Sequence, residues 1–315
     1  MQLMEEDMRI RERYLYSTTK VDRIYVKMWL PDREPEIIVQ IAHGMVEHIG
    51  RYEEFARFLC SQGIGVVGND HLGHGKSVET AAQYGYFAKK NGAEAVLSDL
   101  YLVTRYIKSQ YPKCRLFLFG HSMGSFFARK YMTRYDRKLD GVILSGTGHI
   151  PFGVAAAGKM MAGIMIIARG GFYRSKLLHM LSTGGYGTYF ADEECKSWLT
   201  RDQQLAAKYD ADPLCRFRFT ASAYYDFFGV LMDLAAEKQF KKIRRKLPIL
   251  MISGEDDPVG SFGKGVKTVY RTFGRIGMKN VQMKLYAKAR HELLNETNRE
   301  DVYQDVFAWI CEQLG

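Results

Sequence analysis

Cysteine is scarce in this chain, and its spacing forms no metal or disulfide pattern. The 315 residues include five cysteines, none of them in a C-x-x-C pair: Cys60, Cys114, Cys195, Cys215 and Cys311. An odd, dispersed set favours buried thiols in a reducing compartment. The opening residues MQLMEEDMRIRERY also lack the apolar stretch of a secretory signal. We therefore expect a cytoplasmic protein.

Signatures of nucleic-acid binding are missing as well. The net charge is +10, with a dense basic run, KKIRRK, at residues 241–246. No zinc finger or RNA-recognition signature accompanies this run, so we expect no nucleic-acid partner. A positive net charge also occurs where basic residues are simply exposed to water or contact an anionic membrane.

Zinc-ligand spacing is absent from the most histidine-rich turn, HGMVEH at residues 43–48. Zinc-binding helices place histidines four apart or use H-x-x-E-H. His43 and His48 lie five apart, which rotates the second side chain by roughly 140° from the first in a helix. The preceding residues EIIVQIA are strand-like. The stretch therefore indicates a strand and its following turn, and we expect no metal and no cofactor.

Apolar strand-like runs alternate with helical patterns along most of the chain. Helical spacing of apolar residues occurs at 52–62, 93–111, 125–135 and 301–314. This alternation predicts an α/β fold with a largely parallel sheet. The strand-like runs cover residues 23–30, 36–42, 64–70, 115–120, 141–146, 248–254 and 281–287.

The alternation breaks near residue 150. Residues 150–168 include one charge, Lys159, so a membrane span has to be weighed. Several glycines and a mid-chain position favour a buried or lid helix. We predict a core of residues 1–149 and 236–315, with residues 150–235 inserted as a cap that contributes an acyl-chain pocket and can contact a membrane or micelle.

The strongest chemical signal is Gly120-His121-Ser122-Met123-Gly124, a G-x-S-x-G between a strand and a helix. In that context the glycines allow a sharp turn that exposes a nucleophilic serine. The helix start behind it offers N–H groups to developing negative charge. Ser122 is therefore the predicted nucleophile.

In folds that carry the serine on such a strand-turn-helix, the acid and then the histidine follow it along the chain. His291 is the only histidine beyond residue 179. Asp257 and, as an alternative, Asp256 follow the strand at 248–254, and spacing alone does not separate them. Backbone N–H groups of Met123 and Met45 are the predicted oxyanion donors.

Together, HGMVEHIGRY, DHLGHGKS, GHSMGS, SGEDDPVG and RHELLNE resemble the motif set of the monoacylglycerol lipase and lysophospholipase group of α/β-hydrolases, also known as serine aminopeptidase-like hydrolases. The matches run in order from about residue 36 to 300. The resemblance implies a Ser-Asp-His triad with Asp257 as the acid, and a helical cap. It further implies that Glu47 and Arg51 contact the substrate, although both can equally form a structural ion pair. His121 is a further substrate-binding candidate, whereas His71 and His74 are expected to shape a loop.

These features predict a serine carboxylic-ester hydrolase that acts through an acyl-enzyme. The expected substrates are small acyl esters such as monoacylglycerols and lysophospholipids. Alternatives are a prolyl-aminopeptidase-like peptidase, a short-chain acetyl esterase, and a catalytically silent ligand-binding protein of the same fold.

Overall fold

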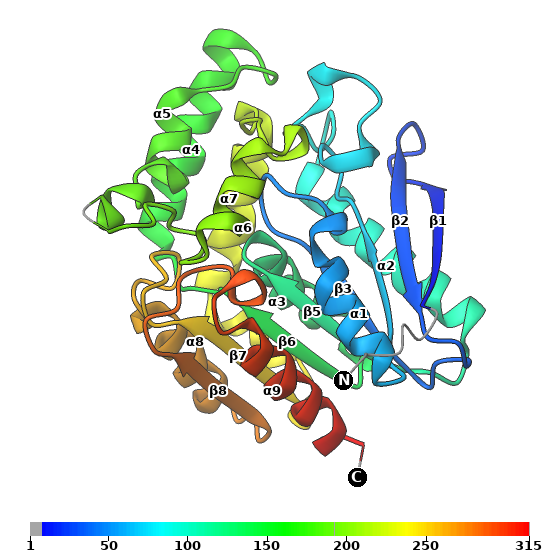
Figure 1. Ribbon diagram of the computed structural model, residues 1–315. Coiled ribbons are helices and arrows are strands. Elements are labelled where there is room, and N and C mark those ends of the chain that lie inside the picture. Colours follow the sequence, from blue (N-terminus) through cyan, green and yellow to red (C-terminus); the bar gives the residue numbers. More distant parts are fainter. Residues whose placement is uncertain (1–7, 192, 315) are drawn as a thin grey trace.

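The computed structural model describes residues 8–191 and 193–314, and an eight-stranded sheet forms its centre (Figure 1). The strand order is β1-β2-β4-β3-β5-β6-β7-β8. Strands β3 to β8 are parallel, whereas β2 pairs antiparallel with both β1 and β4. The strands are β1 (Arg9–Tyr16), β2 (Arg23–Leu30), β3 (Ile37–Ala42), β4 (Gly65–Asn69), β5 (Arg115–His121), β6 (Gly141–Ser145), β7 (Ile249–Gly254) and β8 (Val281–Tyr286).

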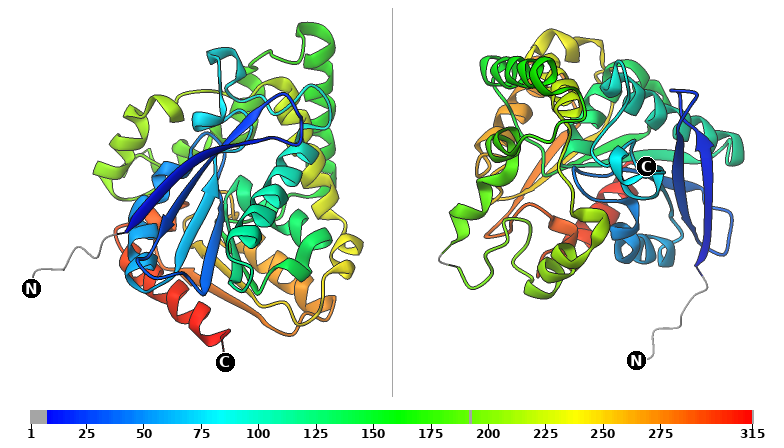
Figure 2. Two further views of the ribbon diagram at one scale, coloured as in Figure 1. Left: turned by 90° about the vertical axis from the view of Figure 1, so that its right-hand side faces the viewer. Right: turned by 90° about the horizontal axis from the view of Figure 1, so that it is seen from above.

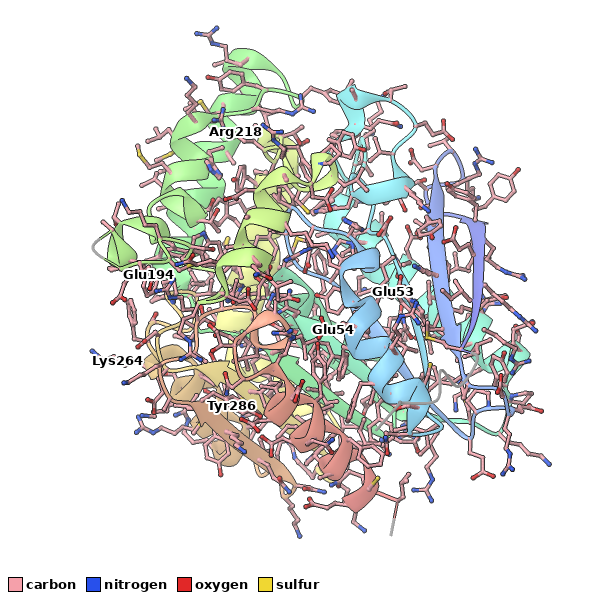
Figure 3. The ribbon with its side chains drawn as sticks, viewed as in Figure 1. Glu53, Glu54, Glu194, Arg218, Lys264 and Tyr286 are labelled. Carbon is pink, nitrogen blue, oxygen red and sulfur yellow. The ribbon has the colours of Figure 1, made fainter. Side chains whose placement is uncertain are left out.

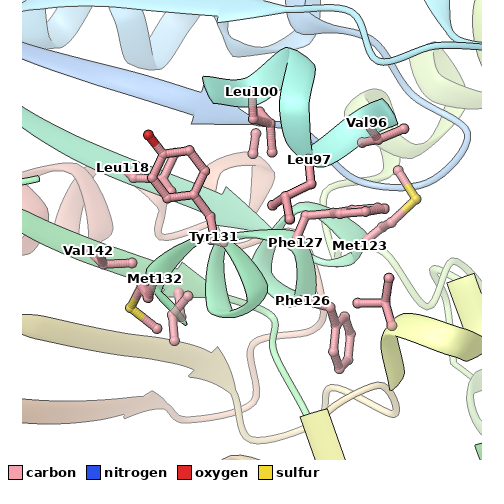
Figure 4. Packing of buried hydrophobic residues seen from close by; sticks show 14 of the residues in the cluster. Val96, Leu97, Leu100, Leu118, Met123, Phe126, Phe127, Tyr131, Met132 and Val142 are labelled. Atoms are coloured by element: carbon pink, nitrogen blue, oxygen red, sulfur yellow. The ribbon is translucent and has the colours of Figure 1, made fainter. Parts of the chain in front are cut away.

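Helices cover both faces of the sheet (Figures 1 and 2). On one face α1 and α9 pack against Val39, Phe117 and Ile143. On the other face α2, α3 and α8 pack against the alternate residues of the same strands, and Figure 4 shows Leu118 and Val142 beneath residues of α2 and α3. The helices are α1 (Glu53–Ser61), α2 (Gly92–Gln110), α3 (Met123–Tyr135), α4 (Phe152–Arg169), α5 (Lys176–His179), α6 (Gln203–Ala211), α7 (Ala221–Ala235), α8 (Lys264–Arg275) and α9 (Arg299–Glu312).

The seven strands that the sequence predicts are all present, but β1 was missed. Its residues RIRERYLY are nearly all exposed because β1 is an edge strand with only β2 beside it. Arginine and glutamate along such an edge discourage pairing with another chain. They also hide the apolar periodicity by which a strand is normally recognised.

Strands β3 and β5 are neighbours, yet the chain leaves them in opposite directions across the sheet. After β3 it continues to β4 on one side, and after β5 it continues to β6 on the other. In open α/β sheets, ligands bind beyond the carboxyl ends of strands at such a switch point. The turns after β3 and β5, which carry HGMVEH and GHSMG, meet there.

The segment between β6 and β7 contains helices α4 to α7, and the figures show α4 beside α7 at the outside of the molecule (Figures 1 and 2). Among the described residues, α4 is the one helix long and apolar enough to span a membrane by length and composition alone. Only 11% of it is buried. Helix α4 is thus a surface helix, and the alternative of a buried helix is wrong. The boundaries of the cap, residues 150–235, stay a prediction from the sequence.

Candidate active site

Ser122 occupies a sharp turn between β5 and α3. Its backbone has φ 51° and ψ −121°, a conformation that is strained for a residue with a side chain. A Cβ on Gly124 would collide with the carbonyl oxygen of Ala42 at the end of β3. The start of α3 can therefore approach β3 this closely only because residue 124 is glycine. The G-x-S-x-G segment forms the strand-turn-helix expected from the sequence.

His291 and Asp257 form a buried pair beside this turn. The His291 Nδ1 atom lies 2.9 Å from Asp257 Oδ1, and the same carboxylate accepts hydrogen bonds from the Val259 N–H at 2.8 Å and the Ser253 hydroxyl at 3.2 Å. An ionised carboxylate only accepts, so Nδ1 carries the proton and Nε2 is the basic nitrogen. Of the two candidate acids, the structure places Asp257 against the imidazole.

The surroundings of His291 set its basicity. Burial lowers the pKa of His291, but the charge and hydrogen bond of Asp257 outweigh burial, so the pKa lies above its usual value. The His121 ring lies 4.8 Å away, and burial followed by the charge of His291 lowers the pKa of His121 to about 3. The Trp198 ring lies over His291 at 5.0 Å. His121 is therefore neutral wherever His291 titrates.

A cavity of about 820 Å³ opens beside the pair, and its lining includes Ser122, His121, His291 and Met45. A Cβ on Gly44 would lie 3.1 Å from the Ser122 Cβ, so the turn after β3 lies against the serine. Met123 opens α3 directly after Ser122. Both residues of the predicted oxyanion hole thus adjoin the serine, and the role of their N–H groups stays a prediction.

Glu47 and Arg51 belong to a buried ion-pair network. The Arg51 guanidinium donates to Glu47 Oε2 at 2.8 Å and to both oxygens of Glu292 at 2.7 and 2.6 Å. Glu47 also accepts from the Tyr52 hydroxyl at 2.9 Å and from the Gly44 N–H. The structural ion pair that the sequence left open is present. Glu47 lines the cavity, whereas Arg51 lies behind it, and substrate contact by either residue stays a prediction.

The histidines of the turns after β3 and β4 hold those turns together. His43 Nε2 accepts the His71 N–H at 2.9 Å, and His71 Nε2 lies 3.1 Å from the His43 carbonyl oxygen. His74 lies edge-on to His43, with ring centroids 5.1 Å apart. Burial lowers the pKa of His71 to about 3 and that of His74 to about 4. These contacts support the expected loop-shaping role of His71 and His74.

One group of potential metal ligands occurs among the described residues: His48, Asp212 and Cys215. His48 Nδ1 accepts the Gly50 N–H at 3.2 Å, and Nε2 lies 2.9 Å from Asp212 Oδ2. With Nδ1 as acceptor, Nε2 carries the proton and donates it to Asp212. That tautomer has no lone pair at Nε2 for an ion, so the group is better described as a link between the β3 turn and the inserted segment.

Several residues that line the cavity were not singled out from the sequence. Trp198, Arg174, Arg216 and Arg218 all come from the inserted segment. For the last two a signal exists, because RFRF at 216–219 alternates charge and aromatic side chains. Helix α4 contributes no residue to this lining within the described chain. Several apolar α4 side chains, including Ile164 and Ile167, are exposed instead, and the expectation that the apolar insert forms an acyl-chain pocket stays a prediction.

The fold and the sequence have counterparts among known proteins. A carboxyl esterase from Bacillus coagulans, solved in complex with glycerol, is 27% identical and superimposes with a TM-score of 0.90 over 98% of this chain and 100% of its own. A monoacylglycerol lipase of Mycolicibacterium smegmatis is 26% identical over 93% of this chain and 94% of its own length. A mouse monoglyceride lipase is 25% identical over 93% of this chain and 88% of its own.

These similarities confirm the α/β-hydrolase fold with its helical insertion, and they define the class as a serine ester hydrolase. More particularly, the chain belongs to the family described as serine aminopeptidase, S33, whose sequence pattern matches residues 33–298. The resemblance to the monoacylglycerol lipase group that the motifs indicated is thereby confirmed.

Proposed function

We propose that the protein hydrolyses small acyl esters through an acyl-enzyme at Ser122, with monoacylglycerols, lysophospholipids and related esters as the substrate class. The buried His291–Asp257 pair, placed beside a strained serine at the mouth of a cavity, is the observation that carries this proposal. The related proteins named above are lipases and esterases, which supports the same chemistry.

The arrangement of these groups supports the following reaction. His291 Nε2 accepts the proton of the Ser122 hydroxyl while the oxygen attacks the ester carbonyl, and Asp257 stabilises the imidazolium that forms. The N–H groups of Met45 and Met123 hold the oxyanion. His291 then protonates the departing alcohol, and water releases the carboxylic acid by the reverse sequence. The reaction needs no cofactor.

Peptidase activity is disfavoured by the charges in the cavity. A site for a free amino group needs an available carboxylate. Within residues 8–191 and 193–314, the carboxylates that line the cavity are those of Glu47 and Glu292, and both are bonded to Arg51. We therefore expect aminoacyl amides to be poor substrates.

Ser122→Ala tests the proposal directly. We expect p-nitrophenyl butyrate hydrolysis to fall by about 10³-fold or more, and labelling by a fluorophosphonate probe to disappear. Ser109→Ala, a serine on the exposed side of α2, is the matched control and should retain both. Full hydrolysis or labelling in the Ser122 variant would show that another group is the nucleophile. If the wild type neither hydrolyses the ester nor reacts with the probe, the protein is a catalytically silent binding protein.

We further propose that α4 contacts lipid surfaces. Its exposed side chains include Val154, Met160, Ile164 and Ile167, and Leu181 follows in the same segment. Exposed apolar patches of this kind are typical of interaction sites, and an ester lipase has to meet substrate that resides in membranes or micelles.

A further inference from the structure

The cavity beside Ser122 has a strongly cationic wall. Arg174, Arg216 and Arg218, all from the inserted segment, line it together with His179. Figure 3 shows the Arg218 side chain at the end of the molecule where the insert lies. None of these residues takes part in the hydrolytic chemistry proposed above, so their presence in the same cavity needs a separate explanation.

The aromatic residues beside Arg216 and Arg218 fix this part of the wall. In RFRF at 216–219, Phe219 is fully buried and Phe217 stacks against it with an angle of 10° between the rings. Phe219 anchors the segment on the core, and the Arg216 and Arg218 side chains, which are largely exposed, line the cavity together with Phe217.

Arg174 is held in place by backbone carbonyls. One of its terminal nitrogens, Nη2, donates to the carbonyl oxygens of Ala82 and Tyr84, both at 2.8 Å. Ala81 and Tyr84 line the same cavity. These bonds fix the guanidinium at the wall without neutralising its charge, and its other N–H groups are left for a ligand.

The positive charge on this wall has no ion-pair partner in the part of the chain that the structure describes. Among the described residues, none of the three arginines forms an ion pair, and the two carboxylates of the lining are already bonded to Arg51. Burial and then the charge of Arg218 lower the pKa of His179. A cleft lined by charge of one sign concentrates ligands of the opposite sign, and the net charge of +10 acts in the same direction.

We propose that this wall binds a phosphate group carried by the substrate, so that the protein hydrolyses acyl esters of phosphorylated alcohols such as an acyl glycerol phosphate. The planar guanidinium group matches phosphate oxygens with paired N–H donors. Since the acyl part of a lipid ester is an apolar chain, the phosphate belongs to the alcohol part. Hydrolysis breaks the acyl–oxygen bond with one water and releases the carboxylic acid and the intact alcohol phosphate. This inference rests on the ester hydrolysis proposed above and specifies its substrate.

A short-chain substrate pair tests the inference in solution. Butyryl glycerol 3-phosphate and butyryl glycerol differ only in the phosphate and are too short to form micelles. We expect the wild type to favour the phosphate ester in kcat/KM, and the double variant Arg216→Gln/Arg218→Gln to lower the ratio of the two kcat/KM values by about tenfold or more. Arg216→Lys/Arg218→Lys keeps the charge and should retain most of the ratio.

Three further measurements make the result specific. Arg137→Gln/Arg271→Gln removes the same charge from exposed arginines outside the cavity and should keep the wild-type ratio. Added salt should lower kcat/KM for the phosphate ester far more than for the neutral ester, because salt screens exposed charges. Glycerol 3-phosphate should inhibit p-nitrophenyl butyrate hydrolysis competitively in the wild type and weakly in the Gln variant.

The outcomes separate three cases. Equal use of the two esters by the wild type, or an unchanged ratio in the Gln variant, overturns the inference while leaving ester hydrolysis intact. A Gln variant that loses only its binding to vesicles of an anionic phospholipid, with an unchanged ratio on the soluble pair, assigns the arginines to a membrane surface and also overturns it. If the wild type hydrolyses neither these esters nor p-nitrophenyl butyrate, the proposed function itself fails.

Discussion

The imidazole of His291 is bonded through Nδ1 to Asp257 Oδ1 at 2.9 Å, and both side chains are almost completely buried. The two residues lie 34 positions apart in the chain and are brought together by the loops that follow β7 and β8. This contact orients the imidazole, selects its tautomer and leaves Nε2 able to accept a proton, so the proposed catalytic roles can be tested through it.

The two acids after β7 should respond differently to amidation. Asp257→Asn keeps the shape but removes the charge that stabilises the imidazolium, and we expect kcat to fall roughly 10³- to 10⁴-fold. Asp256→Asn should stay near the wild type because the imidazole bonds to Asp257. Steady-state hydrolysis of p-nitrophenyl butyrate measures both, and the reverse ranking would assign the acid to Asp256.

The pH dependence should report His291. As the base, His291 has to be neutral, and Asp257 holds its pKa above the ordinary value of 6.5. Activity should therefore fall as pH is lowered, with a midpoint above 6.5. In Asp257→Asn, burial, which lowers the pKa of His291, is opposed only by the weaker charge effects of Glu292 and Glu47, so the acid limb of the residual activity should move to lower pH. A profile of kcat/KM against pH checks this, and a midpoint well below 6.5 in the wild type would contradict it.

The Arg51–Glu292 pair should contribute substantially to stability. The Arg51 and Glu292 side chains are 12% and 6% exposed, and Glu292→Gln leaves a buried guanidinium short of charge compensation. We expect the free energy of unfolding in urea to fall by about 3 kcal/mol. Glu54→Gln, which removes an exposed partner of Arg299 (Figure 3), should change it by less than about 1 kcal/mol. Equal losses of unfolding free energy in the two variants would show that the buried pair contributes no more to stability than the exposed pair.

Gly124 should tolerate no side chain. Gly124→Ala forces a methyl group into the Ala42 carbonyl, where only backbone can give way, and we expect a destabilisation of about 1–3 kcal/mol together with reduced turnover. Gly274→Ala in α8 meets nothing within 4 Å and should be neutral or stabilising. Thermal unfolding of the two variants checks this prediction. A Gly124 variant as stable as the wild type would argue against this close approach of α3 to β3.

Helix α4 should determine binding to lipid. Ile164 and Ile167 are 57% and 89% exposed, and replacing both with glutamate should weaken co-sedimentation with neutral vesicles by about tenfold or more. Tyr16→Glu changes an exposed side chain on β1 and should have no effect. Equal binding by all three proteins would contradict lipid contact through α4.

Local features of the chain were predictable from its sequence. The strand-turn-helix around Ser122 follows from two glycines and the flanking periodicities, because a tight turn depends on residues adjacent in sequence. The order of Ser122, Asp257 and His291 also followed, since each lies in the turn or loop after a strand of the same sheet. Strand β1 was not predicted because an exposed edge strand shows little apolar periodicity.

Contacts between distant segments were decided only by the tertiary structure. Spacing alone left Asp256 and Asp257 open, and the packing of the loops after β7 and β8 places Asp257 against His291. Arg51 and Glu292 lie 241 positions apart in the chain, and no local sequence pattern predicts their pairing. The outward-facing α4 and the arginine wall likewise depend on how the insert packs on the core. A sequence determines local backbone preferences directly, whereas pairings between distant side chains depend on the register and orientation of whole elements.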